Sequence, residues 1–149
     1  MLASDLSPPV SIVVPAFNEA AGIVDSVRSM TMLRYPRFEI VVVNDGSTDD
    51  TLALLVAAFE MEEVTMPFRT DIRTKQITRV FRSNLPLPIV VVDKVNGGKA
   101  DALNAGTNVA RYPYVFLTDA DVVLDPDCLL RAMRHVVADR DRTVAVAGN

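Results

Sequence analysis

The chain contains one cysteine, Cys128, and one histidine, His135, among its 149 residues. A single cysteine cannot close an internal disulfide, and one cysteine with one histidine supplies too few soft ligands for a structural zinc site. This cysteine usage fits a reducing compartment, so we expect a cytoplasmic location for this domain. We assign neither residue a functional role.

Long apolar runs and an excess of positive charge are also missing. No run approaches the roughly 20 residues of a membrane span, and the start MLASDLSPPV lacks the basic region and apolar stretch of a signal peptide. We therefore expect a soluble chain without a signal peptide. With 15 Lys and Arg against 19 Asp and Glu, the net charge is -4, which argues against a general nucleic-acid or anionic-lipid surface. Any anion site must be local.

The remaining composition, 50% hydrophobic and 23% charged, is that of a single globular domain with one core. Five apolar, β-branched runs predict strands that are buried on both faces, at residues 10–14, 38–43, 89–92, 114–117 and 144–147. Between them apolar residues recur at helical spacing, over residues 20–30, 52–59, 102–110 and 129–137. This alternation predicts an α/β fold with a mostly parallel sheet and helices on both faces.

Local signals refine the boundaries of these elements. Ser47 and Asp50 have the spacing of a capping box, and Asp125 followed by Pro126 marks the entry to the last helix. Residues 60–88 break the alternation, and we interpret them as a long excursion between the second helix and the third strand. The excursion is predicted to be a solvated connection with an edge strand around Ile77–Arg82, because acidic residues offset much of its positive charge.

Polar clusters directly follow four of the predicted strands. They are PAFNE (15–19), NDGSTDD (44–50), DKVNGGKADALN (93–104) and TDAD (118–121). In an open α/β sheet the carboxyl ends of parallel strands meet at one edge, where ligands bind. The sequence therefore predicts one site built from all four clusters.

The second cluster places Asp45 and Gly46 between a strand and a helix start at Ser47. A carboxylate there can accept hydrogen bonds from ribose hydroxyls or a base N–H, and Gly46 lets a ligand approach the backbone. Residues 44–46 are equally suited to an ordinary turn. In the first cluster Glu19 is expected to open a helix, where the dipole stabilises a carboxylate whatever its function.

The fourth cluster places Asp119 and Asp121 two residues apart after an apolar strand. Mg²⁺ and Mn²⁺ prefer oxygen ligands and are often held by one or two carboxylates together with substrate phosphates. The pair therefore predicts a metal site that bridges to a diphosphate. The alternative is a solvent-exposed loop, because this spacing is common.

The third cluster combines two glycines, a helix start and Lys99. Exposed N–H groups and the helix dipole favour an anion there, and Lys99 adds a positive charge. The spacing is not that of a Walker loop, and no GxGxxG follows a strand, which argues against a dinucleotide oxidoreductase.

Together PAFNE, VVVNDGSTDDT, NGGKADALNAG and TDADVVLDP resemble the family 2 glycosyltransferases over nearly the whole chain. The KADALNAG segment is similar to the processive membrane synthases of cellulose, chitin, hyaluronan and poly-N-acetylglucosamine. The resemblance implies the GT-A (Rossmann-like) fold and transfer of a sugar, with inversion, from a nucleotide diphosphate donor, usually a UDP-sugar, to a saccharide or lipid-linked acceptor. It also implies a parent protein that is anchored in the membrane through parts outside this chain, with a cytosolic catalytic domain.

Carried over to this chain, the resemblance gives Asp119 and Asp121 as the Mg²⁺ or Mn²⁺ pair, with Asp121 preferred as the direct ligand. Asp45 would bind uracil or ribose, and Lys99 would meet the diphosphate or donor sugar. The implied nucleotide-sugar residues are Pro15, Ala16, Phe17, Asn18, Glu19, Asp45, Gly46, Ser47, Asn96, Gly97, Gly98, Lys99, Asp119 and Ala120.

The resemblance implies no catalytic residue within this chain, because the family's general base is an aspartate of a later motif, expected beyond Asn149. We therefore expect residues 1–149 to be the donor-binding part of a catalytic domain, truncated at the C-terminus and inactive alone. Two other hypotheses remain open. One is a sugar-phosphate nucleotidyltransferase, although the Gly- and Arg-rich loop expected after the first strand is missing. The other is a receiver-like Mg²⁺-binding module, which would need an acidic pair near the first strand.

Overall fold

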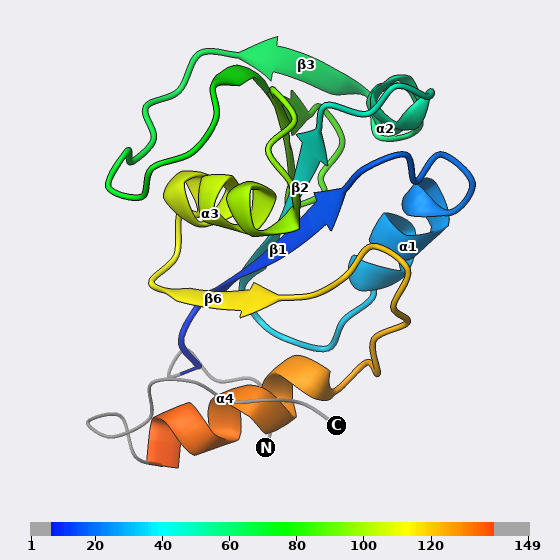
Figure 1. The fold of residues 1–149 in the computed structure, drawn as a ribbon. Coiled ribbons are helices and arrows are strands. Elements are labelled where there is room, and N and C mark those ends of the chain that lie inside the picture. Colours follow the sequence, from blue (N-terminus) through cyan, green and yellow to red (C-terminus); the bar gives the residue numbers. More distant parts are fainter. Residues whose placement is uncertain (1–6, 139–149) are drawn as a thin grey trace.

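The computed structural model describes residues 7–138, which form one sheet with helices packed on both of its faces (Figure 1). The α/β architecture agrees with the alternation in the sequence. The strand expected at residues 144–147 lies outside the described residues, and so does Asn149, beyond which the general base is expected. The placement of that base stays a prediction.

The sheet has six strands in the order β3-β4-β5-β2-β1-β6. Strands β5, β2, β1 and β6 run parallel, whereas β3 pairs antiparallel with β4, and β4 pairs antiparallel with β5. β1 therefore lies between β2 and β6, and chain order runs in opposite directions on its two sides, which is where open sheets form ligand crevices. The strands are β1 (Val10–Ala16), β2 (Phe38–Asp45), β3 (Met61–Val64), β4 (Ile77–Ser83), β5 (Ile89–Lys94) and β6 (Tyr114–Leu117).

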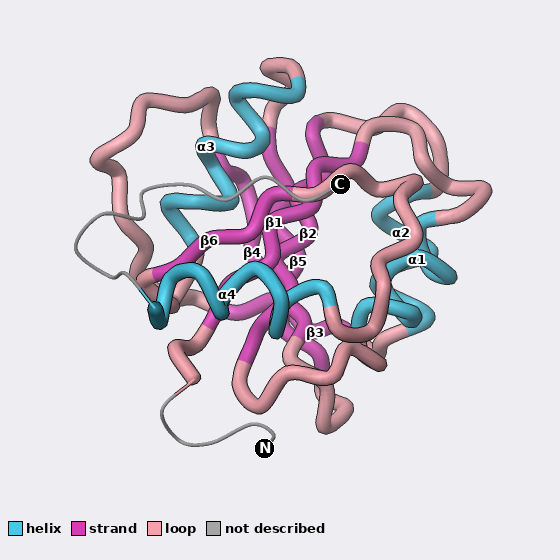
Figure 2. Tube along the Cα trace, turned by 90° about the horizontal axis from the view of Figure 1, so that it is seen from below, coloured by secondary structure: helices cyan, strands magenta, loops and turns pink. Residues whose placement is uncertain are grey.

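The helices divide between the two faces of the sheet (Figure 2). α3 covers one face, where its buried residues Ala102, Ala105 and Val109 pack on valines of the central strands. The other three helices pack on the opposite face, around Ile12 and Ile40. The helices are α1 (Ile23–Met30), α2 (Thr51–Ala58), α3 (Lys99–Val109) and α4 (Cys128–Ala138).

The parallel strands at the centre of the sheet run further than their apolar segments. β1 continues through Pro15 and Ala16, β2 through Asn44 and Asp45, and β5 through Asp93 and Lys94. Backbone pairing with the neighbouring strand holds these residues extended, as in the register of Asp45 with Lys94. Several polar residues that were expected in the loops after the strands therefore belong to the strands themselves. Because side chains alternate along a strand, the position of each residue in the strand determines which face of the sheet its side chain occupies.

Two predicted helix starts are wrong. α2 begins at Thr51, and the hydroxyl of Ser47 accepts a hydrogen bond from the Asn18 N–H instead of capping a helix. α1 begins at Ile23, so Glu19 lies one turn earlier, and its carbonyl accepts the N–H groups of Gly22 and Ile23. The entry to α4 is as predicted, since the Asp125 carboxylate accepts the Asp127 N–H just before the helix.

Residues 60–88 are more ordered than the predicted solvated connection. The strand expected around Ile77–Arg82 is present as β4, but β3 pairs outside it and forms the edge. The segment between them lies against α3, where the buried Asn108 amide bonds both the N–H and the carbonyl of Ile72. Arg69 donates to the carbonyls of Thr107 and Ala110 at the end of that helix. Within residues 7–138 no helix is long and apolar enough to cross a membrane.

Candidate functional site

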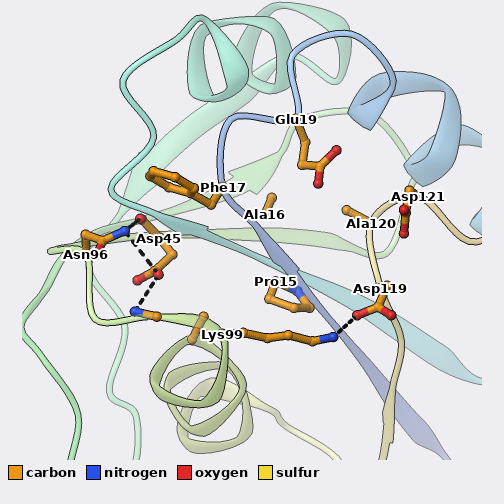
Figure 3. Close-up of a pocket in the computed structure, with 12 residues that line it drawn as sticks. Pro15, Ala16, Phe17, Glu19, Asp45, Asn96, Lys99, Asp119, Ala120 and Asp121 are labelled. Carbon is orange, nitrogen blue, oxygen red and sulfur yellow. Dashed lines mark hydrogen bonds and ion pairs between the residues drawn. The ribbon is translucent and has the colours of Figure 1, made fainter.

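A cleft of about 600 Å³ opens at the carboxyl ends of β1, β2 and β6 (Figure 3). All four predicted clusters contribute residues to it, so the structure brings them together as expected. Eleven predicted site residues line the cleft, together with Ala102, which the sequence did not single out: Pro15, Ala16, Phe17, Glu19, Asp45, Asn96, Gly98, Lys99, Asp119, Ala120 and Asp121.

Four predicted site residues do not line the cleft, and two of them, Asn18 and Ser47, join its loops from behind. The Asn18 side-chain oxygen accepts the N–H groups of Thr48 and Asp49 at 2.8 and 3.3 Å. Its own N–H donates to the Ser47 hydroxyl at 3.0 Å. Through its side-chain oxygen and its N–H, Asn18 fixes the loop after β1 to the loop after β2.

The other two are the glycines Gly46 and Gly97, which allow close packing behind the cleft. Gly46 has a φ of +67°, and a Cβ there would lie 2.8 Å from Asn96. A Cβ at Gly97 would lie 2.4 Å from the Asp101 carboxylate. At Gly46 the positive φ and the nearby Asn96 backbone favour glycine, whereas at Gly97 the crowding atoms belong to the side chains of Asp101 and Lys75. The ligand approach expected at Gly46 is taken by Asn96.

Asp45 is buried at the end of β2, with its carboxylate on the α3 side of the sheet. Oδ1 accepts the Lys94 ammonium and the Gly97 N–H, the latter at 2.9 Å. Oδ2 accepts the Gly98 N–H at 2.9 Å and the Asn96 amide at 3.4 Å. Four donors match the four lone-pair positions of a carboxylate. Contact with uracil or ribose stays a prediction, and it would require one of these bonds to open.

The same bonds correct the expectation for the glycine loop. The N–H groups of Gly97 and Gly98, expected to be open to an anion, both point at Asp45. The first turn of α3 follows directly, and its N–H groups have no partner within the helix. An anion in the cleft would therefore meet this turn and the side chain of Lys99.

Lys94 is the main residue that sequence reasoning missed. Its side chain is fully buried, and its ammonium pairs with Asp45 and, at 2.6 Å, with Asp101. Burial opposes ionisation of Asp101, but the hydrogen bonds from Lys94 and from the Lys75 N–H prevail and hold its pKa below the usual value. The sequence shows only a lysine at the end of an apolar strand, because its partners are brought together by the fold.

Across the cleft, Lys99 extends from α3 and pairs with Asp119 (Figure 3). Both side chains are partly exposed, at 64% and 48%. Asp121 is exposed on the same loop, and Glu19 also faces the cleft. The cleft thus holds these three carboxylates and one ammonium that is already paired with one of them. It is therefore a poor site for a diphosphate alone and a suitable one for a diphosphate with a divalent cation.

A family model described as glycosyl transferase family 2 matches residues 11–148 of the chain. The chain belongs to this family. Among its curated relatives is the poly-beta-1,6-N-acetyl-D-glucosamine synthase of Staphylococcus epidermidis, which is 32% identical over 118 residues, 79% of this chain and 23% of the relative. The corresponding Staphylococcus aureus synthase (strain COL) is 28% identical over 141 residues, 94% of this chain and 28% of the relative. The chain therefore spans about a quarter of the length of these relatives.

Solved structures of other proteins have a similar fold. The mannosyltransferase PcManGT from Pyrobaculum calidifontis, in complex with GDP-Man and Mn²⁺, superposes with a TM-score of 0.67 at 28% identity, covering 97% of this chain and 36% of the other. TarS 1–349 of S. aureus, in complex with UDP-GlcNAc, gives a TM-score of 0.63 at 22% identity, covering 89% and 32%. The predicted GT-A fold is confirmed.

The carboxylates of this family 2 domain fit a hard divalent cation. Asp119 and Asp121 offer only oxygen ligands, the type that Mg²⁺ and Mn²⁺ prefer. No group of three His, Cys, Asp or Glu side chains that could hold a metal ion occurs between residues 7 and 138. A metal at this position would therefore share its coordination with oxygens of the ligand and with water.

Proposed function

We propose that the cleft binds a nucleotide diphosphate sugar, a UDP-sugar, together with Mg²⁺ or Mn²⁺, for an inverting sugar transfer to a saccharide or lipid-linked acceptor. The observation that carries this proposal is the placement of Asp119 and Asp121 across the cleft from Lys99 and the first turn of α3. This arrangement provides oxygen ligands on one side and positive potential on the other. A diphosphate between them would contact both.

The chemistry of the leaving group matches this arrangement. Sugar transfer releases a nucleoside diphosphate, and negative charge grows on its phosphate oxygens as the bond to the sugar breaks. A divalent cation would stabilise this charge as a Lewis acid when bound by Asp119 and Asp121. Lys99 supplies a further positive charge, and residues 15–17 with Glu19 form the wall proposed to hold the nucleoside.

The sugar and the setting are finer parts of the same proposal. Because the Staphylococcus relatives are named as poly-N-acetylglucosamine synthases, an N-acetylglucosamine donor is the first to test. We also propose that these residues lie on the cytosolic side of a parent protein held in the membrane elsewhere. In this chain donor binding is proposed to be separable from transfer, because the family resemblance places the general base in a later motif, beyond Asn149.

The test is calorimetric titration of UDP into the chain with Mn²⁺ and again with a chelator. We expect binding that depends on the metal. Replacing a direct ligand, Asp121→Ala, should weaken the metal-dependent affinity by more than about tenfold, since even residues that only support a metal ligand contribute that much.

The matched control is Asp25→Ala, which removes an exposed carboxylate on α1, away from the cleft. It should leave UDP affinity unchanged. UDP affinity that is equal with Mn²⁺ and with chelator, or equal in the chain and Asp121→Ala, would rule out the proposed metal site.

A further inference from the structure

Lys94 is a buried charged residue, which is costly unless the charge is paired. It ends β5 directly opposite Asp45 in the sheet register, and its side chain has no solvent exposure. The ammonium donates to the Asp45 carboxylate, to the Asp101 carboxylate and to the Val95 carbonyl, the last two at 2.6 Å. Three acceptors use all three N–H groups of a lysine, so no donor remains for a ligand. Lys94 can therefore act only through its partners.

Those partners hold the loop that leads into α3. Asp45 accepts the N–H groups of Gly97 and Gly98, and the Asp101 carboxylate lies directly against Gly97, where a Cβ would have to displace it. Gly98 has a φ of +96°, a conformation that other residues rarely adopt. The carboxylates of Asp45 and Asp101 thus contact the loop, and Lys94 forms ion pairs with both of them. The residue that follows Gly98 is Lys99, which lines the cleft.

Lys94 also balances charge behind this loop. Without it, the buried Asp45 and the largely buried Asp101 would face each other and the cleft as two carboxylates. Like charges in a site of low dielectric repel strongly, and they would also repel an incoming phosphate. Loss of the Lys94 charge should therefore weaken the binding of a phosphate-bearing ligand more than that of an uncharged one.

We propose that Lys94 is a positioning residue for the diphosphate of the donor: it joins Asp45 to Asp101 and thereby fixes the Asn96–Gly98 loop, the first turn of α3 and Lys99. The inference rests on the proposed function, because it concerns the part of the cleft assigned to the diphosphate. A purely structural ion pair would stabilise the fold without distinguishing one ligand from another.

The first test compares UDP with uridine in Lys94→Met, which keeps much of the volume and removes the charge. With Mn²⁺ present, UDP affinity should fall by at least about tenfold, the scale expected when a binding group is misplaced by about an ångström. Uridine affinity should change much less, because it carries no phosphate. Equal losses for the two ligands, or an unchanged UDP affinity, would overturn the proposal.

The matched control is Glu39→Gln at the other end of the sheet. Glu39 is buried at the start of β2 and accepts hydrogen bonds from Ser11 and from the Arg111 N–H at 2.8 and 2.7 Å. Its replacement also removes a buried charge, so it should lower the melting temperature. UDP affinity of the folded protein should nevertheless stay as in the unaltered chain, and a loss equal to that of Lys94→Met would overturn the proposal.

A second readout needs no ligand. Amide exchange at Gly97 and Gly98 should accelerate by at least about tenfold in Lys94→Met relative to amides of β1, because loss of the anchor permits local opening. Unchanged protection would overturn the proposal.

If Lys94→Met does not fold, Asp101→Asn replaces it, because this variant keeps the buried pair of Lys94 with Asp45. It should show the same changes in smaller degree, and their absence would overturn the proposal.

The outcomes also separate the two proposals. If the unaltered chain fails to bind UDP with Mn²⁺, the proposed function fails. The exchange measurement still tests whether Lys94 holds the Asn96–Gly98 loop in place. If the unaltered chain and Lys94→Met bind UDP equally, only the role of Lys94 fails.

Discussion

The Lys99 ammonium pairs with a carboxylate that is also a proposed metal ligand. Lys99 and Asp119 form an ion pair across the cleft, with both side chains partly exposed. A cation bound at Asp119 would compete with Lys99 for the same oxygens. A diphosphate that entered with the metal would offer Lys99 a new partner. Metal and nucleotide should therefore bind more tightly together than either does alone.

Lys99→Met should separate these two effects. Mn²⁺ alone should bind slightly more tightly, by up to about fivefold, since an exposed ion pair contributes at most about 1 kcal/mol. UDP in the presence of Mn²⁺ should bind about tenfold more weakly, because a charged hydrogen bond to phosphate is lost. Calorimetry of each ligand measures both.

The control for this variant is Arg131→Met, which removes an exposed cation paired with Asp125 at 3.1 Å. It should change neither affinity. If Lys99→Met weakens the binding of Mn²⁺ alone, Lys99 does not compete with the metal for Asp119.

Sequence reasoning identified the residues that face the cleft better than those that support it. Asp119, Asp121 and Lys99 were predictable because they are charged residues beside apolar segments at one edge of the sheet. Lys94 and Asp101 were not, since their importance depends on a buried ion pair between β5 and α3 that only the folded arrangement creates. A lysine at a strand end otherwise resembles an ordinary solvated residue.

At the scale of elements, α3 packs closely on the sheet. Gly106 provides the contact, since a Cβ there would lie 2.3 Å from a methyl group of Val13 and 3.0 Å from one of Val43. The backbone of α3 is thereby brought down onto β1 and β2. The first turn of the same helix reaches the cleft.

Gly106→Ala should destabilise the fold by about 1–2 kcal/mol. Overpacking a core costs about 1–3 kcal/mol, and the better helix propensity of alanine returns up to about 1 kcal/mol. Chemical denaturation measures the difference. Gly22→Ala is the uncrowded control, because a Cβ there meets nothing within 4 Å. Since Gly22 is the N-cap of α1, this variant should cost less than about 1 kcal/mol, from capping alone. Equal stability of Gly106→Ala and the unaltered chain would contradict close packing at this point.

Among the elements, the four parallel strands were predicted and β3 was not. The parallel strands carry apolar runs that only a sheet covered on both faces can bury. β3 has the sequence MEEV, which is short and half charged, as suits an edge strand and also a loop. The attachment of the segment between β3 and β4 to α3 depends on Asn108, whose amide gives no sequence signal for a contact 36 residues away.

At the scale of the whole molecule, the described residues form the cleft proposed to bind the donor, whereas the family resemblance places the general base in a later motif. Donor binding without turnover is therefore expected for residues 1–149 alone. An assay of sugar transfer from UDP-N-acetylglucosamine and other UDP-sugars, with oligosaccharide acceptors and Mn²⁺, should show no product above background, while UDP still binds. Robust turnover by this chain would contradict the expectation and would place a general base among these residues.

The bonds that build the cleft also connect distant parts of the chain. Asn18 reaches Thr48, 30 residues away, and Asp45 reaches Gly97, 52 residues away. We expect such contacts to form after the central parallel strands have paired, because the entropy of closing long loops opposes them until then. Occupancy of the cleft would thus act on the folded state alone: a bound nucleotide would slow unfolding and leave the rate of folding almost unchanged.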